Sequence, residues 1–159
     1  MNWEIERALG PTPDVVALVS ELESELSPHY PPEQRHGLSL NALFEPHIHF
    51  LVARQDGQGA GCGGVALFAG FAELKRFYVK PALRGRGIAD AILRRAGDIA
   101  AAAGRTILRL ETGTQQQAAL RFYARSGFRR CAAFEPYASM PPEAIASSVF
   151  MEKALSWEG

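Results

Sequence analysis

The loop at residues 84–89 joins a strand pattern to a helix pattern, and this junction limits the folds open to the chain. Pro81 closes the strand predicted over 72–79, and the helix predicted over 87–103 ends at Gly104. The loop itself has the sequence Arg-Gly-Arg-Gly-Ile-Ala. Glycines let the backbone approach a ligand closely, while a helix N-terminus and arginines favour an anion. The loop is therefore predicted to bind phosphate, and the lack of a following Gly-Lys-Ser/Thr excludes a Walker loop.

The remaining pattern predicts an α/β fold, because alternating apolar segments are interspersed with segments of helical periodicity. The expected strands are 2–9, 48–54, 62–69, 72–79, 106–111, 128–134 and 147–153, and the expected helices are 13–26, 34–44, 87–103 and 115–126, of which 34–44 has the weaker pattern. This order, βααβββαβαββ, predicts a mixed, largely antiparallel central sheet flanked by about four helices. No repeat or low-complexity linker divides the sequence, so residues 1–159 are expected to form a single domain.

A second set of glycines, Gly59, Gly61 and Gly64, matches the G-x-G-x-x-G spacing of dinucleotide-binding loops. These glycines lie between two predicted strands, so no helix N-terminus follows to meet a pyrophosphate. A hairpin is therefore the favoured interpretation of this segment. The three consecutive strands before the 84–89 loop also disfavour a Rossmann-type oxidoreductase.

The charge balance narrows the possible partners. Seventeen basic and seventeen acidic residues cancel, so no overall positive field is present to hold nucleic acid or an anionic membrane. The first residues lack the apolar run of a signal peptide, which predicts a cytoplasmic protein. Cys62 and Cys131 are too few for a disulfide framework. His47 and His49 share a strand face without a carboxylate or cysteine arranged with them, so no metal is expected.

Four motifs follow one another on consecutive predicted elements: the strand 73–79 with Pro81, the loop pattern Arg84-x-x-Gly87-x-Ala89, and the segments 119–123 and 127–128. Together they resemble the GNAT superfamily of acetyl-CoA-dependent N-acyltransferases. The resemblance implies acetyl-CoA as co-substrate, with its pyrophosphate at the loop and its pantetheine arm beside the preceding strand. The residues implied in cofactor binding are Phe77, Tyr78, Val79, Arg84, Gly85, Arg86, Gly87, Ile88, Ala89 and Gln116. Gln116 stands where many members have asparagine, and it offers the same amide on a longer side chain.

Acyl transfer to an amine requires a proton acceptor, because an amine with a pKa of about 10.4 is protonated at neutral pH. The resemblance makes Glu73 the first candidate base, since it stands eleven positions before Arg84, as a catalytic glutamate does in histone-acetylating members. A solvated glutamate at a strand start is the alternative for Glu73. Glu111 on the next strand is the competing carboxylate, as base or substrate contact. Tyr123 matches the family tyrosine that protonates the departing CoA thiolate, and core packing is its alternative role.

These observations favour an N-acetyltransferase that acts on the primary amine of a small or amino-acid-like molecule by direct attack in a ternary complex. Tyr30 and Tyr137 are expected to border the acceptor pocket. Neither cysteine matches a covalent nucleophile motif, which disfavours an acyl-enzyme. Protein or peptide N-acetylation, a catalytically idle acyl-CoA-binding partner module, and homodimer formation stay open. The identity of the acceptor depends on loop geometry, which the sequence does not give.

Overall fold

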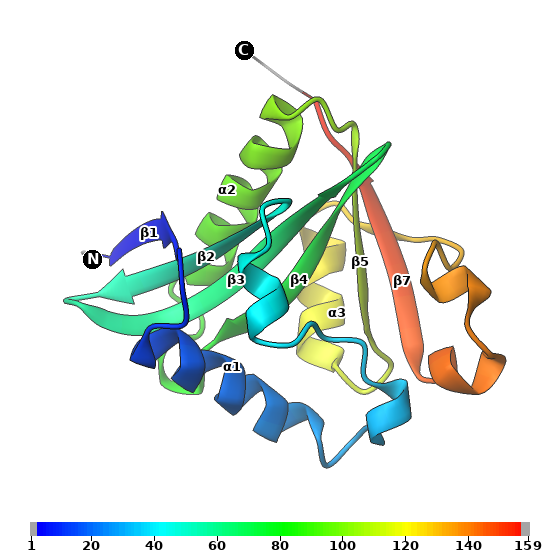
Figure 1. Ribbon diagram of the computed structural model, residues 1–159, viewed down its shortest axis with the longest axis horizontal. Coiled ribbons are helices and arrows are strands. Elements are labelled where there is room, and N and C mark those ends of the chain that lie inside the picture. Colours follow the sequence, from blue (N-terminus) through cyan, green and yellow to red (C-terminus); the bar gives the residue numbers. More distant parts are fainter. Residues whose placement is uncertain (1–2, 157–159) are drawn as a thin grey trace.

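The computed structural model describes residues 3–156 (Figure 1), which form a seven-stranded sheet and three α-helices with short 3₁₀ turns. The strands are β1 (Trp3–Arg7), β2 (Ile48–Gln55), β3 (Gln58–Phe68), β4 (Phe71–Val79), β5 (Ile107–Gly113), β6 (Arg129–Arg130) and β7 (Ser148–Ala154), and the helices are α1 (Pro13–Leu26), α2 (Ile88–Ala102) and α3 (Gln117–Arg125). The sheet order is β1-β2-β3-β4-β5-β7-β6, and β4 and β5 form its one parallel pair. The predicted α/β fold with a mixed, largely antiparallel sheet is confirmed. None of the helices described is long and apolar enough to cross a membrane.

Alternating side chains of β2 divide the apolar interior into two layers. Leu51 and Ala53 belong to the core formed with α2 and α3. Phe50 and Val52 belong to the core on the other face, together with Leu18 of α1. Because successive strand residues point to opposite faces, the sheet carries α1 on one side and α2 and α3 on the other, as Figure 1 shows.

The parallel strands β4 and β5 separate after a short paired stretch. Their paired residues are Ala72 with Leu108 and Glu73 with Arg109. Beyond these pairs the two strands diverge, with α3 behind the divergence (Figure 1). The second half of β4 therefore has unpaired backbone on the side that faces β5.

A bulge in β4 lies in this same region. Gly64 of β3 pairs with Lys75, whereas Cys62 pairs with Tyr78, so β4 accommodates one residue more than β3 over this stretch. Arg76 takes a positive φ of 56° inside the bulge. A bulge bends its strand and re-aims the side chains beside it. The side chains on either side of Arg76 are thereby presented at the point where β4 and β5 diverge.

The helix expected at 34–44 is wrong, so residues 3–156 hold three α-helices rather than the four expected. The segment holds 3₁₀ turns at Pro32–Gln34 and Asn41–Phe44 with non-helical chain between them. Nε and Nη2 of Arg76 donate to the Leu38 carbonyl at 3.2 and 3.1 Å. This long-range bond satisfies a carbonyl that a helix would use, and a glycine inside the segment lowers its helix propensity.

The strand expected at 128–134 is much shorter, since only Arg129–Arg130 pairs with β7. The chain then leaves the sheet edge, and Phe134 forms a separate aromatic cluster with Tyr137 and Phe150. Burial of these rings replaces further strand pairing.

The glycines at 59, 61 and 64 lie in β3, where they permit close packing of this strand against β2, β4 and α1. An ideal Cβ on Gly61 would lie 2.9 Å from the Tyr78 carbonyl oxygen, and one on Gly64 would lie 3.3 Å from the ring of Phe50. The turn residues Asp56 and Gly57 have positive φ values of 52° and 78°, as the hairpin interpretation requires.

Candidate active site

A cavity of about 660 Å³, here called the loop groove, runs along the 84–89 loop. Its walls come from the end of β4, the loop, the first turn of α2, and α3. Nine of the ten predicted cofactor residues line it: Phe77, Tyr78, Val79, Arg84, Gly85, Gly87, Ile88, Ala89 and Gln116. The structure therefore brings these residues together in one place, and Arg86 is the exception.

The N-terminus of α2 opens into the loop groove. Gly87 is the N-cap residue with φ 86°, and no side chain caps this helix. The first N–H groups of an α-helix have no partner within the helix and attract anions. Gly85 also has a positive φ of 79°, and an ideal Cβ on either glycine meets no atom of the described chain within 4 Å. The loop thus offers backbone donors beside open space, which suits a phosphate group.

Arg84 uses its guanidinium to hold the loop in place. Its Nε donates to the Val79 carbonyl at 2.9 Å, and its Nη2 pairs with Glu25 of α1 at 3.1 Å. Arg86 is exposed and does not line the loop groove. The loop groove is therefore lined by Arg84 and not by Arg86, whose part in cofactor binding stays a prediction.

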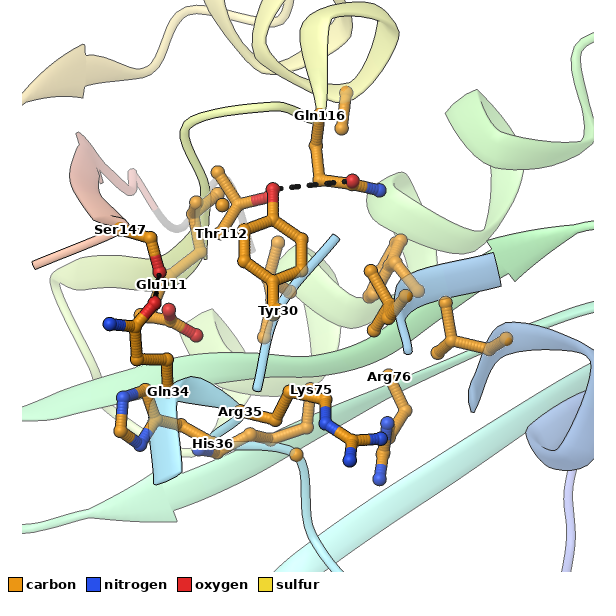
Figure 2. Close-up of a pocket in the computed structure, with 18 of the residues that line it drawn as sticks. Tyr30, Gln34, Arg35, His36, Lys75, Arg76, Glu111, Thr112, Gln116 and Ser147 are labelled. Carbon is orange, nitrogen blue, oxygen red and sulfur yellow. Dashed lines mark hydrogen bonds between the residues drawn. The ribbon is translucent and has the colours of Figure 1, made fainter. Parts of the chain in front are cut away.

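A second cavity, here called the carboxylate pocket, has a volume of about 140 Å³ (Figure 2). Its walls come from the end of α1, residues 30–37, β4, β5 and the start of α3. The two predicted carboxylates and the two predicted acceptor residues all line it: Glu73, Glu111, Tyr30 and Tyr137. Residues from distant parts of the sequence thus meet beside the divergence of β4 and β5.

Glu73 is almost completely buried, with 1% of its surface exposed. The Tyr137 hydroxyl donates to Glu73 Oε2 at 2.6 Å, and Lys75 Nζ lies 2.9 Å from the same oxygen and 2.7 Å from the Tyr137 hydroxyl. Glu73 Oε1 has no partner among the described residues. The interpretation of Glu73 as a solvated strand-start residue is therefore wrong, and one of its oxygens is available to a ligand.

Glu111 is the second carboxylate of the pocket. Burial raises the pKa of Glu111, and the negative charge of Glu73 adds to this effect. The Ser148 hydroxyl, which donates to Glu111 Oε2 at 2.7 Å, acts in the opposite direction, as do His36 and Lys75. A carboxyl with a raised pKa is better matched to proton transfer near neutral pH.

Tyr30 ties the acceptor side to the start of α3. Its hydroxyl accepts from the Gln115 backbone N–H at 2.9 Å and donates to Gln116 Oε1 at 3.3 Å (Figure 2). Gly113 leaves room for this hydroxyl, since a Cβ there would collide with it. The bond to Gln115 holds that residue outside the helix, so α3 begins at Gln117, two residues later than predicted.

The loop groove and the carboxylate pocket share one wall. The shared residues are Leu22, Phe77, Gln116, Ala119 and Tyr123. Burial raises the pKa of Tyr123 above its usual range, so its hydroxyl stays protonated at neutral pH. Its ring also packs against Phe122 and Phe128 at centroid distances of 5.3 and 5.6 Å. Tyr123 therefore fills its predicted packing role and stands where the two cavities meet.

Several residues of the carboxylate pocket were not predicted from the sequence. Gln34, Arg35, Thr112 and Ser147 line it, and Ser147 donates to Gln34 Oε1 at 2.7 Å. No motif or periodicity in the sequence marks these four residues, because each lies in a turn, a loop or near a strand end, and only the tertiary fold brings it to the pocket. Lys75, which also lines the pocket, lies two residues after Glu73 on β4, so the two side chains share a strand face and Lys75 Nζ lies 2.9 Å from Glu73 Oε2.

Comparison with known proteins identifies the family. Residues 46–130, more than half of the chain, match the family model described as "Acetyltransferase (GNAT) domain". The IAA acetyltransferase of Azospirillum brasilense is 42% identical over 143 residues, which cover 89% of this chain and 90% of that protein.

Solved structures agree with this family. A Klebsiella pneumoniae protein, provisionally described as an acyl-CoA N-acyltransferase, has a TM-score of 0.74 and 32% identity, with 97% of this chain and 98% of that chain covered. N-acetylglutamate synthase from Neisseria gonorrhoeae, solved with coenzyme A and N-acetyl-glutamate, shares the fold with a TM-score of 0.74 at 20% identity. The match covers 99% of this chain and 36% of that chain. The chain therefore belongs to the GNAT acetyltransferases and is an acetyl-transferring enzyme.

Proposed function

We propose that this enzyme transfers an acetyl group from acetyl-CoA to the primary amine of a small, amino-acid-like molecule, by direct attack in a ternary complex. The observation that carries the proposal is the shared wall of the two cavities. A groove with uncapped backbone donors meets a pocket with two carboxylates at Tyr123. Such an arrangement lets two substrates be bound at once with their reacting groups close together.

The loop groove fits acetyl-CoA through its own backbone. The N–H groups around Gly85, Gly87 and Ile88 would hold the pyrophosphate, and Arg84 would keep the loop in position through its bond to Val79. The unpaired half of β4, at Phe77 to Val79, would pair with the amide groups of the pantetheine arm. When bound, acetyl-CoA supplies the activated thioester.

The carboxylates and the tyrosine would divide the proton transfers. Glu73 would accept the proton of the acceptor amine at Oε1, directly or through a water, while Lys75 and Tyr137 hold Oε2. Glu111 would hold the amine and is the competing base. Tyr123, a phenol that carries its proton at neutral pH, would give that proton to the departing sulfur.

The size of the carboxylate pocket supports a small acceptor. Its volume of about 140 Å³ is close to the ~150 Å³ of an engineered protein cavity that binds benzene. The name of the Azospirillum brasilense relative gives IAA, not a protein, as the acetylated compound. Both observations favour a small molecule over a protein substrate, and two carboxylates in the pocket disfavour a catalytically idle module.

The test is a screen of amines with the purified enzyme and acetyl-CoA, followed by release of free thiol. The expected result is acceptor-dependent thiol release together with an acetylated product of the matching mass. A protein that binds acetyl-CoA but acetylates no small amine, while it acetylates peptides, would overturn the choice of acceptor class.

A further inference from the structure

Two buried side-chain atoms of the described residues have no hydrogen-bond partner, Arg35 Nε and Glu73 Oε1. Both residues line the carboxylate pocket. Buried polar atoms in folded proteins are nearly always paired, because an unpaired one has lost its water without a replacement. One of these two atoms is a donor on a cationic group, and the other is an acceptor on an anionic group.

We propose that the acceptor is a zwitterion whose anionic group, a carboxylate or phosphonate, binds Arg35 while its amine binds Glu73. This inference rests on the proposed acetyl transfer to an amine and adds a second charge to the acceptor. An amine alone would pair with Glu73 Oε1 and leave Arg35 Nε without a partner. A molecule that carries both groups satisfies both atoms at once.

The other ion pairs of the pocket leave Arg35 as the site for an anion. Arg35 Nη1 lies 3.1 Å from Glu23 Oε2, and Arg76 Nη2 pairs with Glu23 Oε1. Two guanidinium groups thus share one carboxylate, which leaves about one positive charge uncompensated. Figure 2 shows Arg35 and Arg76 together on one side of the pocket, with Glu111 and Ser147 across from them.

The edge of the Arg35 guanidinium that carries Nε is the one suited to an oxyanion. Arginine binds carboxylates and phosphonates through two N–H groups in a planar fork. Glu23 contacts Nη1, so its bond does not use Nε. Lys75 is a poorer anion site, because its ammonium already contacts Glu73 Oε2 and the Tyr137 hydroxyl at 2.9 and 2.7 Å.

The first experiment compares acceptors that differ only in the anionic group. Each of the common α-amino acids is tested with acetyl-CoA beside its primary amide and the amine that lacks the carboxyl group. β-Alanine and 4-aminobutyrate vary the spacing of the two charges, and 1-aminoethylphosphonate replaces the carboxylate of alanine. The expected result is a kcat/KM for the best zwitterion about 10-fold to 100-fold above the values for the matching amide and amine, which lack the anionic group.

The second experiment alters Arg35. Arg35→Gln should raise KM for the best zwitterion by about 10-fold to 100-fold, with kcat and the KM for acetyl-CoA nearly unchanged. The KM for the matching amine that lacks the anionic group should not change. Arg35→Lys keeps the charge without the planar fork and should recover part of the loss. If Arg35 has only a structural role, Arg35→Gln should instead raise the KM for the zwitterion and the KM for the matching amine together.

Arg54→Gln is the matched control for the loss of an ion-paired arginine. Arg54 of β2 pairs with Asp14 at the start of α1 and with Glu6 of β1, and it lines neither cavity. Its substitution should leave both acceptor constants unchanged. Thermal unfolding of all three variants shows that they are folded at the assay temperature.

Calorimetric titration of the best zwitterion into the CoA-saturated enzyme separates the proposed binding of the anionic group by Arg35 from the proposed acetyl transfer. Equal kcat/KM values for amino acids, amides and amines would overturn the zwitterion while leaving acetyl transfer to amines intact. Acetylation of no amine at all would overturn the proposed function. In that case, binding of α-amino acids that Arg35→Gln abolishes still supports the subsite, and absence of binding overturns it.

Discussion

The loop groove and the carboxylate pocket are built by different means. About half of the residues that line the groove come from one stretch of chain, residues 77–90, whose backbone N–H groups and glycines supply its chemistry, and the rest come from α1, α3 and the residues next to these helices. The pocket takes side chains from α1, residues 30–37, β4, β5 and two loop positions near the C-terminus. The groove would thus bind acetyl-CoA mainly through backbone groups that are close in sequence, whereas the pocket would bind the acceptor through side chains from distant parts of the sequence. Substitutions should therefore separate into effects on the cofactor, on the acceptor, and on the reaction at their shared wall.

Tyr123→Phe tests the shared wall and should have the largest effect. The substitution keeps the ring that packs against Phe122 and Phe128 and removes the hydroxyl proton. If that proton is given to the departing thiolate, kcat should fall by about 10²-fold or more. The affinity for CoA should stay near that of the wild type. Steady-state kinetics measures kcat, and calorimetry measures CoA affinity. An unchanged kcat at saturating substrates would limit Tyr123 to packing.

Glu73→Gln tests the acceptor side and should lower kcat/KM by about 10-fold to 100-fold at neutral pH. The loss should shrink at alkaline pH, because more of the acceptor amine is then already neutral. A pH profile of kcat/KM measures this dependence.

Glu111→Gln is the matched variant for Glu73→Gln. If Glu73 is the base, Glu111→Gln should raise the acceptor KM without an alkaline recovery of kcat. The reverse result, with recovery confined to Glu111→Gln, would transfer the role of base to Glu111, whose pKa burial raises.

The difference between the two regions also explains what the sequence could predict. The strand, loop and helix from 72 to 103 were located within about one residue at each end, since proline, glycine and helical periodicity mark them locally. Nine of the ten residues that the family resemblance implied in cofactor binding line the groove. Arg86 does not line it, and the sequence does not give the direction of a side chain beside two glycines with positive φ.

The carboxylate pocket was predicted in part. The family resemblance points to Glu73, and Glu111 lies on the next predicted strand, but nothing in the sequence points to Arg35, because residues 34–44 were expected to form a helix. That segment is instead held by Arg76, whose positive φ belongs to a bulge in β4. Neither the bulge nor the contact leaves a local mark in the sequence, so this wall depends on the tertiary structure.

Gly87→Ala tests the loop groove and should have a smaller effect than the carboxylate variants. A side chain at φ 86° is strained and projects into open space beside the expected phosphate site. We expect the KM for acetyl-CoA to rise by up to about tenfold, with the KM for the acceptor unchanged. Steady-state kinetics with each substrate varied in turn measures both constants.

Gly104→Ala is the control, because Gly104 also has a positive φ of 81° and no atom near its Cβ position, but lies at the other end of α2. Both variants should lose about 1 kcal/mol of stability from backbone strain. Only Gly87→Ala should also weaken the binding of acetyl-CoA. Equal kinetic losses in the two variants would mean that strain in α2, and not access to the groove, is responsible.

Asp14→Asn should have the smallest effect, on stability alone. The hydrogen bond from Arg54 lowers the pKa of Asp14 to about 2, from a usual value of 3.8. The ionised form is thus favoured in the folded state, and its stabilisation is fully present above the unfolded pKa and lost as pH falls through the folded one. Because the carboxylate is partly exposed, we expect Asp14→Asn to lower the free energy of unfolding by about 1 kcal/mol at pH 7. Urea unfolding should show this difference shrinking from pH 4 to pH 2.

The kinetic constants of Asp14→Asn sharpen the comparison between the two cavities. Asp14 lies in the first turn of α1, whose later residue Leu22 lines both cavities, but Asp14 itself lines neither. A small loss of stability at this end of α1 should therefore leave the KM for acetyl-CoA and the KM for the acceptor unchanged. If either KM changes while the protein stays folded, a shift of α1 must alter the shape of the cavity that binds the corresponding substrate. The effects of Gly87→Ala and Glu73→Gln would then have to be measured against this variant, because groove and pocket would no longer be independent.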